Sequence, residues 1–261
     1  MGRRQGLTPE AGGHWFEAVA DHLGEAYLRY SFTKGTVNEV DTIIELTGLS
    51  PGASVLDVGC GPGRHALELA DRGYDVVGVD ISETFIGIAA AEADRRGLTN
   101  ARFEVADGRS LRFDARFDAV ISLCQGAFGL SGGPGSETSI DRELDEPILA
   151  GMASAAVAGG SVIVSAFSAY FQVKYEEQTD NFDADLGINR EDTVVRNPAG
   201  EDREVELWTT CYTPRELRLL ARSAGLEPRA VYGVSPGRYQ PDPPSTDCPE
   251  FLLVATVPDG D

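Results

Sequence analysis

The chain has 261 residues, of which 42% are hydrophobic, and it contains 30 glycines and 14 prolines. This composition indicates a folded globular protein with one large α/β domain. With 42 acidic and 22 basic residues the formal charge is −20, so phosphate backbones and anionic lipid surfaces are repelled, and we expect no nucleic-acid and no membrane partner. The same charge attracts a cationic amine, although surface acids also serve solubility alone. The sequence does not decide the oligomeric state, and a homodimer stays open.

The four cysteines are widely spaced and form no Cys-x-x-Cys pair or Cys/His cluster, so the sequence predicts no metal site and no redox dithiol. No apolar run approaches the roughly 18 residues that span a bilayer, and residues 1–10 lack the hydrophobic stretch of a secretory signal. We therefore expect a cytoplasmic protein.

Apolar residues recur at helical spacing from Gly13 to Tyr30 and predict an amphipathic helix, and a second helix is expected over Asn38–Thr47, before Gly48. Five β-rich runs follow: Ser54–Val58, Asp75–Val79, Ala101–Val105, Phe117–Leu123 and Ser161–Phe167. Helical stretches separate them, at Arg64–Arg72, Thr84–Arg96 and Leu144–Val157. Strands that alternate with helices imply a parallel sheet with helices on both faces.

The pattern changes between Phe167 and Tyr212 to a polar, acidic stretch that predicts an inserted hairpin, with strands at Asp192–Arg196 and Arg203–Thr209. A capping box with proline in the first turn predicts a helix over Thr213–Ala224. The last strands are expected at Arg229–Val234 and Glu250–Val257, and the proline-dense stretch between them, Pro236–Pro249, is expected to be a loop.

The chemistry is concentrated in residues 55–65, which read Val-Leu-Asp-Val-Gly-Cys-Gly-Pro-Gly-Arg-His, an apolar strand that passes through glycines into a helix. Glycines let the backbone approach a ligand closely, and a helix start offers free N–H groups. Asp80 ends the next strand, 19 residues after Gly61, where a carboxylate can accept hydrogen bonds from ribose hydroxyls. Arg64 stands where a dinucleotide fingerprint has its third glycine, so a nicotinamide or flavin enzyme is the less favoured alternative.

Residues 57–63 followed by Asp80 resemble the first two motifs of class I S-adenosylmethionine-dependent methyltransferases. Residues 105–108 (Val-Ala-Asp-Gly) resemble that family's third motif, which implies that Asp107 contacts the adenine amino group. Residues 117–123 resemble the strand beneath the methyl donor, residues 158–160 the glycine turn before the fifth strand, and Phe251–Val257 the reversed last strand. The likeness covers roughly residues 37–167. The Asn/Asp-Pro-Pro-aromatic tetrad of related base methylases is missing after Leu123, which argues against methylation of nucleic-acid bases.

The resemblance implies an α/β, Rossmann-like fold: a seven-stranded, mostly parallel sheet with a reversed last strand, an N-terminal helical lid and a small β insertion. We expect a lid at residues 1–36, a core that binds S-adenosylmethionine at 37–167, a hairpin that caps the substrate at 168–212, and completion of the core at 213–261. The implied cofactor-binding residues are Gly59, Cys60, Gly61, Gly63, Arg64, Asp80, Ile81, Asp107, Gly108 and Leu123, with Tyr30 and Lys34 from the lid. The candidates for substrate contact are Gln125, Phe128, Tyr170 and Tyr212.

The expected activity is methyl transfer from S-adenosylmethionine to a nitrogen, oxygen or carbon atom of a small organic molecule. The protein must mainly align the reactants, because the cofactor supplies the electrophile. No spacing singles out a general base among His14, Gln125, Tyr170 and Tyr212, and Asp57 is either a ligand contact or a cap of the glycine loop. Two alternatives remain: a non-methylating enzyme on the same scaffold, such as one that resembles aminopropyl transferases, and a nucleoside-binding protein without catalysis.

Overall fold

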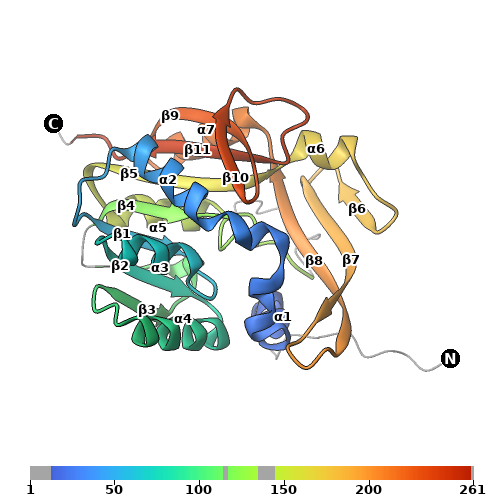
Figure 1. The fold of residues 1–261 in the computed structure, drawn as a ribbon. Helices are drawn as coiled ribbons and strands as arrows, with labels where there is room; N and C mark the ends of the chain where they lie inside the picture. Colours follow the sequence, from blue (N-terminus) through green and yellow to red (C-terminus); the bar gives the residue numbers. More distant parts are fainter. Residues whose placement is uncertain (1–12, 114–116, 135–144, 260–261) are drawn as a thin grey trace.

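A twisted sheet runs through the molecule, and the computed structural model describes it within residues 13–113, 117–134 and 145–259 (Figure 1). Its main path has the strand order β10-β9-β11-β5-β4-β1-β2-β3. The parallel strands are β1 (Ser54–Val58), β2 (Asp75–Asp80), β3 (Ala101–Val105), β4 (Phe117–Ser122) and β5 (Ala156–Ser168). β11 (Glu250–Thr256) runs antiparallel between β5 and β9 (Glu227–Ser235). The expected parallel sheet with a reversed last strand is thereby confirmed.

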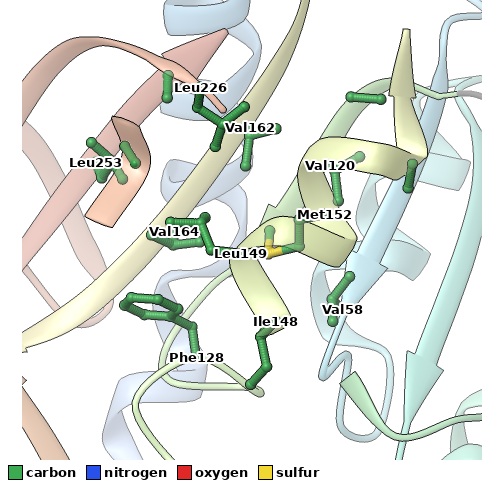
Figure 2. Packing of buried hydrophobic residues seen from close by; sticks show 14 of the residues in the cluster. Val58, Val120, Phe128, Ile148, Leu149, Met152, Val162, Val164, Leu226 and Leu253 are labelled. Atoms are coloured by element: carbon green, nitrogen blue, oxygen red, sulfur yellow. The ribbon is translucent and has the colours of Figure 1, made fainter. Parts of the chain in front are cut away.

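Helices cover both faces of this sheet (Figure 1). α2 (Thr36–Thr47), α3 (Arg64–Asp71) and α4 (Glu83–Arg96) lie on one face, and α5 (Glu146–Ala155) and α7 (Pro214–Ser223) lie on the other. Figure 2 shows the second layer, where Leu149 and Met152 of α5 pack against Val162 and Val164 of β5. The α2 side is held by a separate apolar cluster that includes Ile43 and Leu69. The sheet is therefore buried on both faces, as a parallel sheet requires.

Most of the predicted bounds agree with the structure to within a few residues, because local capping signals fix them. The capping box that opens α7 is present, with the Glu216 backbone N–H donating to the Thr213 side chain and the Thr213 backbone N–H donating to Glu216. α2 ends at Gly48, whose φ of 63° is left-handed. β10 (Arg238–Asp242) differs from expectation, since it adds an edge strand within the stretch predicted to be a loop.

The N-terminal segment is shorter and more broken than predicted. α1 covers only Trp15–Leu23, because Gly24 takes a φ of 44° that ends the helix, and two 3-10 turns follow at Gly24–Arg29 and Ser31–Gly35. One apolar face of α1 packs against the inserted hairpin rather than the central sheet, in a cluster of Trp15, Val19, Leu23, Ile188, Val195, Val205 and Trp208. α1 and the hairpin therefore stand together beside the sheet (Figure 1).

The hairpin itself is confirmed, with longer strands than predicted: β7 (Ile188–Arg196) pairs antiparallel with β8 (Asp202–Tyr212). The end of β8 pairs with the end of β5, which joins the hairpin to the central sheet. Two elements beside it were not predicted, α6 (Ala169–Lys174) and β6 (Asp180–Asp183). Within the described part of the chain, no helix is both long and apolar enough to cross a membrane.

Candidate active site

The glycine loop between β1 and α3 passes in direct contact with the turn that follows β4. The backbone N–H groups of Gly59 and Cys60 both donate to the Val79 carbonyl oxygen, at 2.7 and 2.9 Å, which ties the loop to β2. Gly59 has a φ of 72°, and a Cβ atom on it would lie 2.0 Å from the carbonyl carbon of Gly126. A side chain at position 59 is therefore excluded by both the backbone conformation and the neighbouring chain.

Two buried carboxyl groups support this loop. Asp80 accepts hydrogen bonds from the backbone N–H groups of Gly61 at 2.8 Å and Ser82 at 2.9 Å, and burial raises its pKa to about 6. Asp57 lies at the end of β1, where burial raises its pKa to about 7 and the Ala66 backbone N–H in the first turn of α3 donates to it. This contact favours the role of a cap for Asp57 over that of a ligand contact.

A first cavity opens at the carboxyl ends of β1, β2 and β4, where open α/β sheets bind their ligands. The space between its walls, part of which is open to solvent, is about 400 Å³. It is lined by His14, Phe16, Gly59, Asp80, Ile81, Ala106, Asp107, Gly108, Arg109, Gly126, Ala127, Leu130, Ser131 and Ile148. The cavity thus joins a buried acid at the end of β2 to a second acid after β3.

That second acid, Asp107, is partly exposed and already paired within its own turn. Its carboxylate accepts from the backbone N–H and the guanidinium of Arg109, the latter as close as 2.6 Å. Although burial raises the pKa of Asp107, these hydrogen bonds outweigh it, so that the pKa is lowered. Asp107 is therefore a carboxylate, and both of its oxygens accept hydrogen bonds from Arg109.

The turn after β4 is strained. Cys124 and Gln125 have φ values of 51° and 52°, although neither is a glycine, and such left-handed residues cost of order 1–3 kcal/mol each. The turn is held by hydrogen bonds from the Cys124 backbone N–H to the Ser165 hydroxyl at 2.7 Å and from the Gly126 N–H to the Leu123 carbonyl at 3.1 Å. Backbone strain of this kind concentrates at functional sites.

A second cavity adjoins the first, and the space between its walls, part of which is open to solvent, is about 1090 Å³. It lies between α1, the hairpin and the strained turn, and its wall is mainly aromatic and aliphatic. It is lined by Trp15, Phe16, Val19, Leu23, Tyr27, Tyr30, Phe32, Cys124, Gln125, Leu130, Phe167, Glu191, Thr193, Val194, Val195, Leu207, Thr209, Pro236 and Glu250. Phe16 and Leu130 line both cavities, so the two spaces share a boundary.

One buried acid in this second wall has an unsatisfied oxygen. Glu250 is 1% exposed, and its Oε1 accepts a hydrogen bond from Gln125 Nε2 at 2.9 Å. Its Oε2 has no hydrogen-bond partner among the described residues. Burial raises the pKa of Glu250 to about 7.

Beside the strained turn, Arg64 is engaged in a buried ion pair. Its guanidinium donates to the carboxylate of Glu39 and to Cys124 Sγ, and Glu39 also bonds His65 Nε2 at 2.8 Å. Burial opposes the charge on Glu39, but His65 and Arg64 outweigh it and lower the pKa of Glu39 to about 2. Glu39, His65 and Cys124 lie close enough to ligate a metal, yet the guanidinium already supplies a positive charge at this point.

The structure brings together many of the residues expected from the sequence. Among those expected to bind the cofactor, Gly59, Asp80, Ile81, Asp107 and Gly108 line the first cavity. Tyr30 and Gln125 line the second.

The other predicted residues line neither of these two cavities. Cys60 and Leu123 are buried, and Arg64 is ion-paired; Gly61 and Gly63 shape the loop, and Lys34 lies in the second 3-10 turn. Phe128 is fully buried in the core beside Ile148 (Figure 2), where it stacks on Tyr212 at 5.1 Å between ring centroids. Tyr212 and Tyr170 line a separate, open hollow near α6 and α7.

Neither Glu250 nor Glu39 was predicted from the sequence to belong to the site. Glu250 opens an apolar strand, and because this strand is reversed, its first residue lies at the same edge as the carboxyl ends of the parallel strands. A charged residue at the start of this apolar strand could therefore have been recognised from the sequence as a candidate site residue. His14, which was considered as a base, lies in the first cavity and bonds the Leu130 carbonyl oxygen through Nε2 at 3.0 Å.

Comparison with known proteins agrees with this geometry. The family described as "Methyltransferase domain" matches residues 55–130. A 2-heptyl-1-hydroxyquinolin-4(1H)-one methyltransferase of Mycobacteroides abscessus is 47% identical over 68 residues, which cover 26% of this chain and 30% of that protein. Nocamycin O-methyltransferase of Saccharothrix syringae is 38% identical over 33% of this chain and 32% of its own length. The chain thus spans about a third of the length of these two relatives.

A longer match comes from an uncharacterized methyltransferase of Schizosaccharomyces pombe, which is 32% identical over 138 residues, or 52% of this chain and 87% of that protein. Among solved structures, the CcbJ methyltransferase from Streptomyces caelestis superposes with a TM-score of 0.70 at 18% identity and covers 94% of this chain and 97% of its own, a likeness of fold. With the motifs of the glycine loop and the acid that ends β2, these matches identify the chain as a member of the class I S-adenosylmethionine-dependent methyltransferase family.

Proposed function

We propose that this protein transfers the methyl group of S-adenosylmethionine to a small organic molecule and releases S-adenosylhomocysteine. The observation that carries the proposal is the pair of adjoining cavities with Phe16 and Leu130 at their common boundary. One cavity has acidic groups at the edge of the sheet, and the other has an aromatic wall. The two relatives of which about a third is matched are named as methyltransferases of a quinolone and of nocamycin, which supports a small-molecule acceptor.

The residues of the first cavity fit the cofactor. Gly59 leaves the loop without a Cβ atom where it meets the facing turn. Asp80 would accept hydrogen bonds from the ribose hydroxyls, and Asp107 one from the adenine amino group. When bound, S-adenosylmethionine supplies an electrophilic methyl group on a positively charged sulfur. The engagement of Arg64 with Glu39 leaves Tyr30 and Lys34 as our candidates for the methionine carboxylate.

The chain itself contributes alignment and exclusion of water. α1 packs on the hairpin and its Trp15 Nε1 donates to the Gly132 carbonyl oxygen at 2.6 Å, so that the N-terminal segment, the hairpin and the turn after β4 form one wall. A wall of this kind holds an acceptor in a fixed orientation, which is the main requirement of a direct displacement. We propose on this ground that residues 13–36 act as a lid and residues 168–212 as a cap on the acceptor. Residues 1–12 of the expected lid lie outside the described residues.

The test is transfer of a labelled methyl group. The purified protein is incubated with S-adenosylmethionine that carries a deuterated methyl group and with a mixture of small apolar amines, phenols and hydroxyquinolines, and products are analysed by mass spectrometry. The proposal expects labelled product together with S-adenosylhomocysteine. Binding of the cofactor without any transfer would favour a nucleoside-binding protein, and an aminopropyl product from decarboxylated S-adenosylmethionine would favour the non-methylating alternative.

A further inference from the structure

Glu250 is the one buried acid whose side chain lines the second cavity among the described residues. It reaches this position because β11 is reversed, and Glu250 is its first residue, paired with Phe167 near the end of β5 and with Val234 of β9. The carboxyl edge of a parallel sheet is where ligands bind. The acid therefore stands at the edge where the cofactor cavity also opens.

The carboxyl group is held on one side only. Gln125 donates to Oε1, and the strained backbone of the turn fixes Gln125 in that position, while Oε2 has no partner among the described residues. A buried acceptor without a partner destabilises the fold, so a site that retains one is suited to a ligand that donates to it.

The neighbouring charged and titratable groups do not supply a hydrogen bond to Glu250 Oε2. Glu39 faces Glu250 from α2, Arg64 from α3 and Cys124 from the turn, and the Tyr239 hydroxyl lies close on β10. Arg64 is already ion-paired with Glu39, and the charge of Glu39 compensates that of the guanidinium.

The cavity wall favours a cation. Besides Glu250 it contains a second acid, Glu191, and no lysine, arginine or histidine occurs among its described residues. Six of its residues are aromatic: Trp15, Phe16, Tyr27, Tyr30, Phe32 and Phe167. Aromatic faces attract ammonium groups, and two carboxylates without a basic counterpart repel anionic acceptors.

We propose that the methyl acceptor is an amine carried on an apolar or aromatic body, and that Glu250 receives the proton of its ammonium form. This inference rests on the proposed function. The amine enters as an ammonium ion, and one N–H bond breaks as the proton passes to the Glu250 carboxylate. The freed nitrogen lone pair then forms the new N–C bond while the C–S bond of the methyl donor breaks. The product is a methylated ammonium ion, S-adenosylhomocysteine and a proton on Glu250 that is returned to water.

The acidity of Glu250 suits this role. Burial raises its pKa to about 7, which places it near neutral pH, where a general base is most effective. Gln125 orients the carboxylate through Oε1 and acts as a positioning residue.

The test measures binding rather than turnover. The protein is saturated with S-adenosylhomocysteine and titrated in a calorimeter with phenethylamine, 2-phenylethanol and phenylacetate, which share one apolar body. At pH 8 we expect phenethylamine to bind roughly tenfold or more tightly than 2-phenylethanol, as expected for one charge-assisted hydrogen bond, and phenylacetate to bind most weakly. The affinity for phenethylamine should fall below pH 7, since Glu250 then carries a proton while the amine stays charged.

Two variants sharpen the result. Glu250→Gln should abolish the preference for the amine and its pH dependence while the affinity for S-adenosylhomocysteine stays unchanged. Glu206→Gln, an exposed acid of β8 outside the cavity wall, is the control and should behave as the unaltered protein. An amine that binds no more tightly than the alcohol, or a preference that survives Glu250→Gln, overturns the inference while the proposed function stands. Failure of S-adenosylhomocysteine itself to bind would overturn both.

Discussion

We expect Glu250 to lower the free energy of unfolding at neutral pH. Its carboxyl group is buried, its Oε2 has no partner among the described residues, and its pKa is raised from the usual 4.5 to about 7. The unfolded chain releases this proton above pH 4.5, whereas the folded chain retains it up to about pH 7. Stability from this group is therefore fully present below pH 4.5 and is lost as the pH rises through about 7.

The size of the effect follows from the two pKa values. Each tenfold change in proton affinity corresponds to about 1.4 kcal/mol, so the difference amounts to roughly 3 kcal/mol at pH 8. Glu250→Gln keeps an oxygen that accepts from Gln125 and removes the charge. We expect the free energy of unfolding of the variant, relative to the unaltered protein, to rise by about 2–3 kcal/mol between pH 5 and pH 8.

Urea denaturation followed by circular dichroism at half-unit steps of pH measures this difference. Because the substitution also buries a new amide group, the change with pH is the quantity that counts, not the difference at any one pH. A difference that stays constant from pH 5 to pH 8 would show that Glu250 is not a buried acid with a raised pKa, and the reasoning would fail.

Three further outcomes are expected. Gly59→Ala should lower the free energy of unfolding, measured by urea denaturation, by roughly 2–4 kcal/mol and abolish calorimetric binding of S-adenosylhomocysteine. Gly52 is also left-handed but has open space around it, so Gly52→Ala should lower the free energy of unfolding by only about 1–2 kcal/mol and leave binding intact. Asp80→Asn should weaken S-adenosylhomocysteine by about 10- to 100-fold in calorimetry, while Asp75→Asn at the exposed start of the same strand should not; equal affinities would remove Asp80 from the site. Deletion of residues 1–35 should leave a sheet that is folded by circular dichroism, with a hairpin that binds a hydrophobic dye and with little methyl transfer; a truncated protein with full activity would refute the lid.

The cofactor half of the site could be predicted because its signals are local. β1 was placed at its observed bounds, since an apolar run before glycines leaves little choice of register. Asp80 ends β2 and Asp107 follows β3, and the parallel pairing of these two strands brings their carboxyl ends together. The spacing of these residues along the chain was therefore enough to predict where they lie in the fold.

The acceptor half could not be predicted in the same way, because its wall comes from segments far apart in the sequence. Phe128 and Tyr212 were expected to contact substrate, yet they stack on each other away from both cavities, because an aromatic residue in a strand or turn does not reveal which side it faces. Glu250 was overlooked because its role depends on the reversal of β11 and on Gln125, which is 125 residues away. Tertiary pairing, not local pattern, places these groups.

The first cavity is proposed to hold S-adenosylmethionine rather than a dinucleotide. Calorimetric titration of the protein with S-adenosylhomocysteine and, in parallel, with NAD tests it most directly. We predict a saturable interaction with S-adenosylhomocysteine and none with NAD, because Arg64 fills the position of the third glycine and is paired with Glu39. Binding of NAD without binding of S-adenosylhomocysteine would show that the first cavity is a dinucleotide site instead.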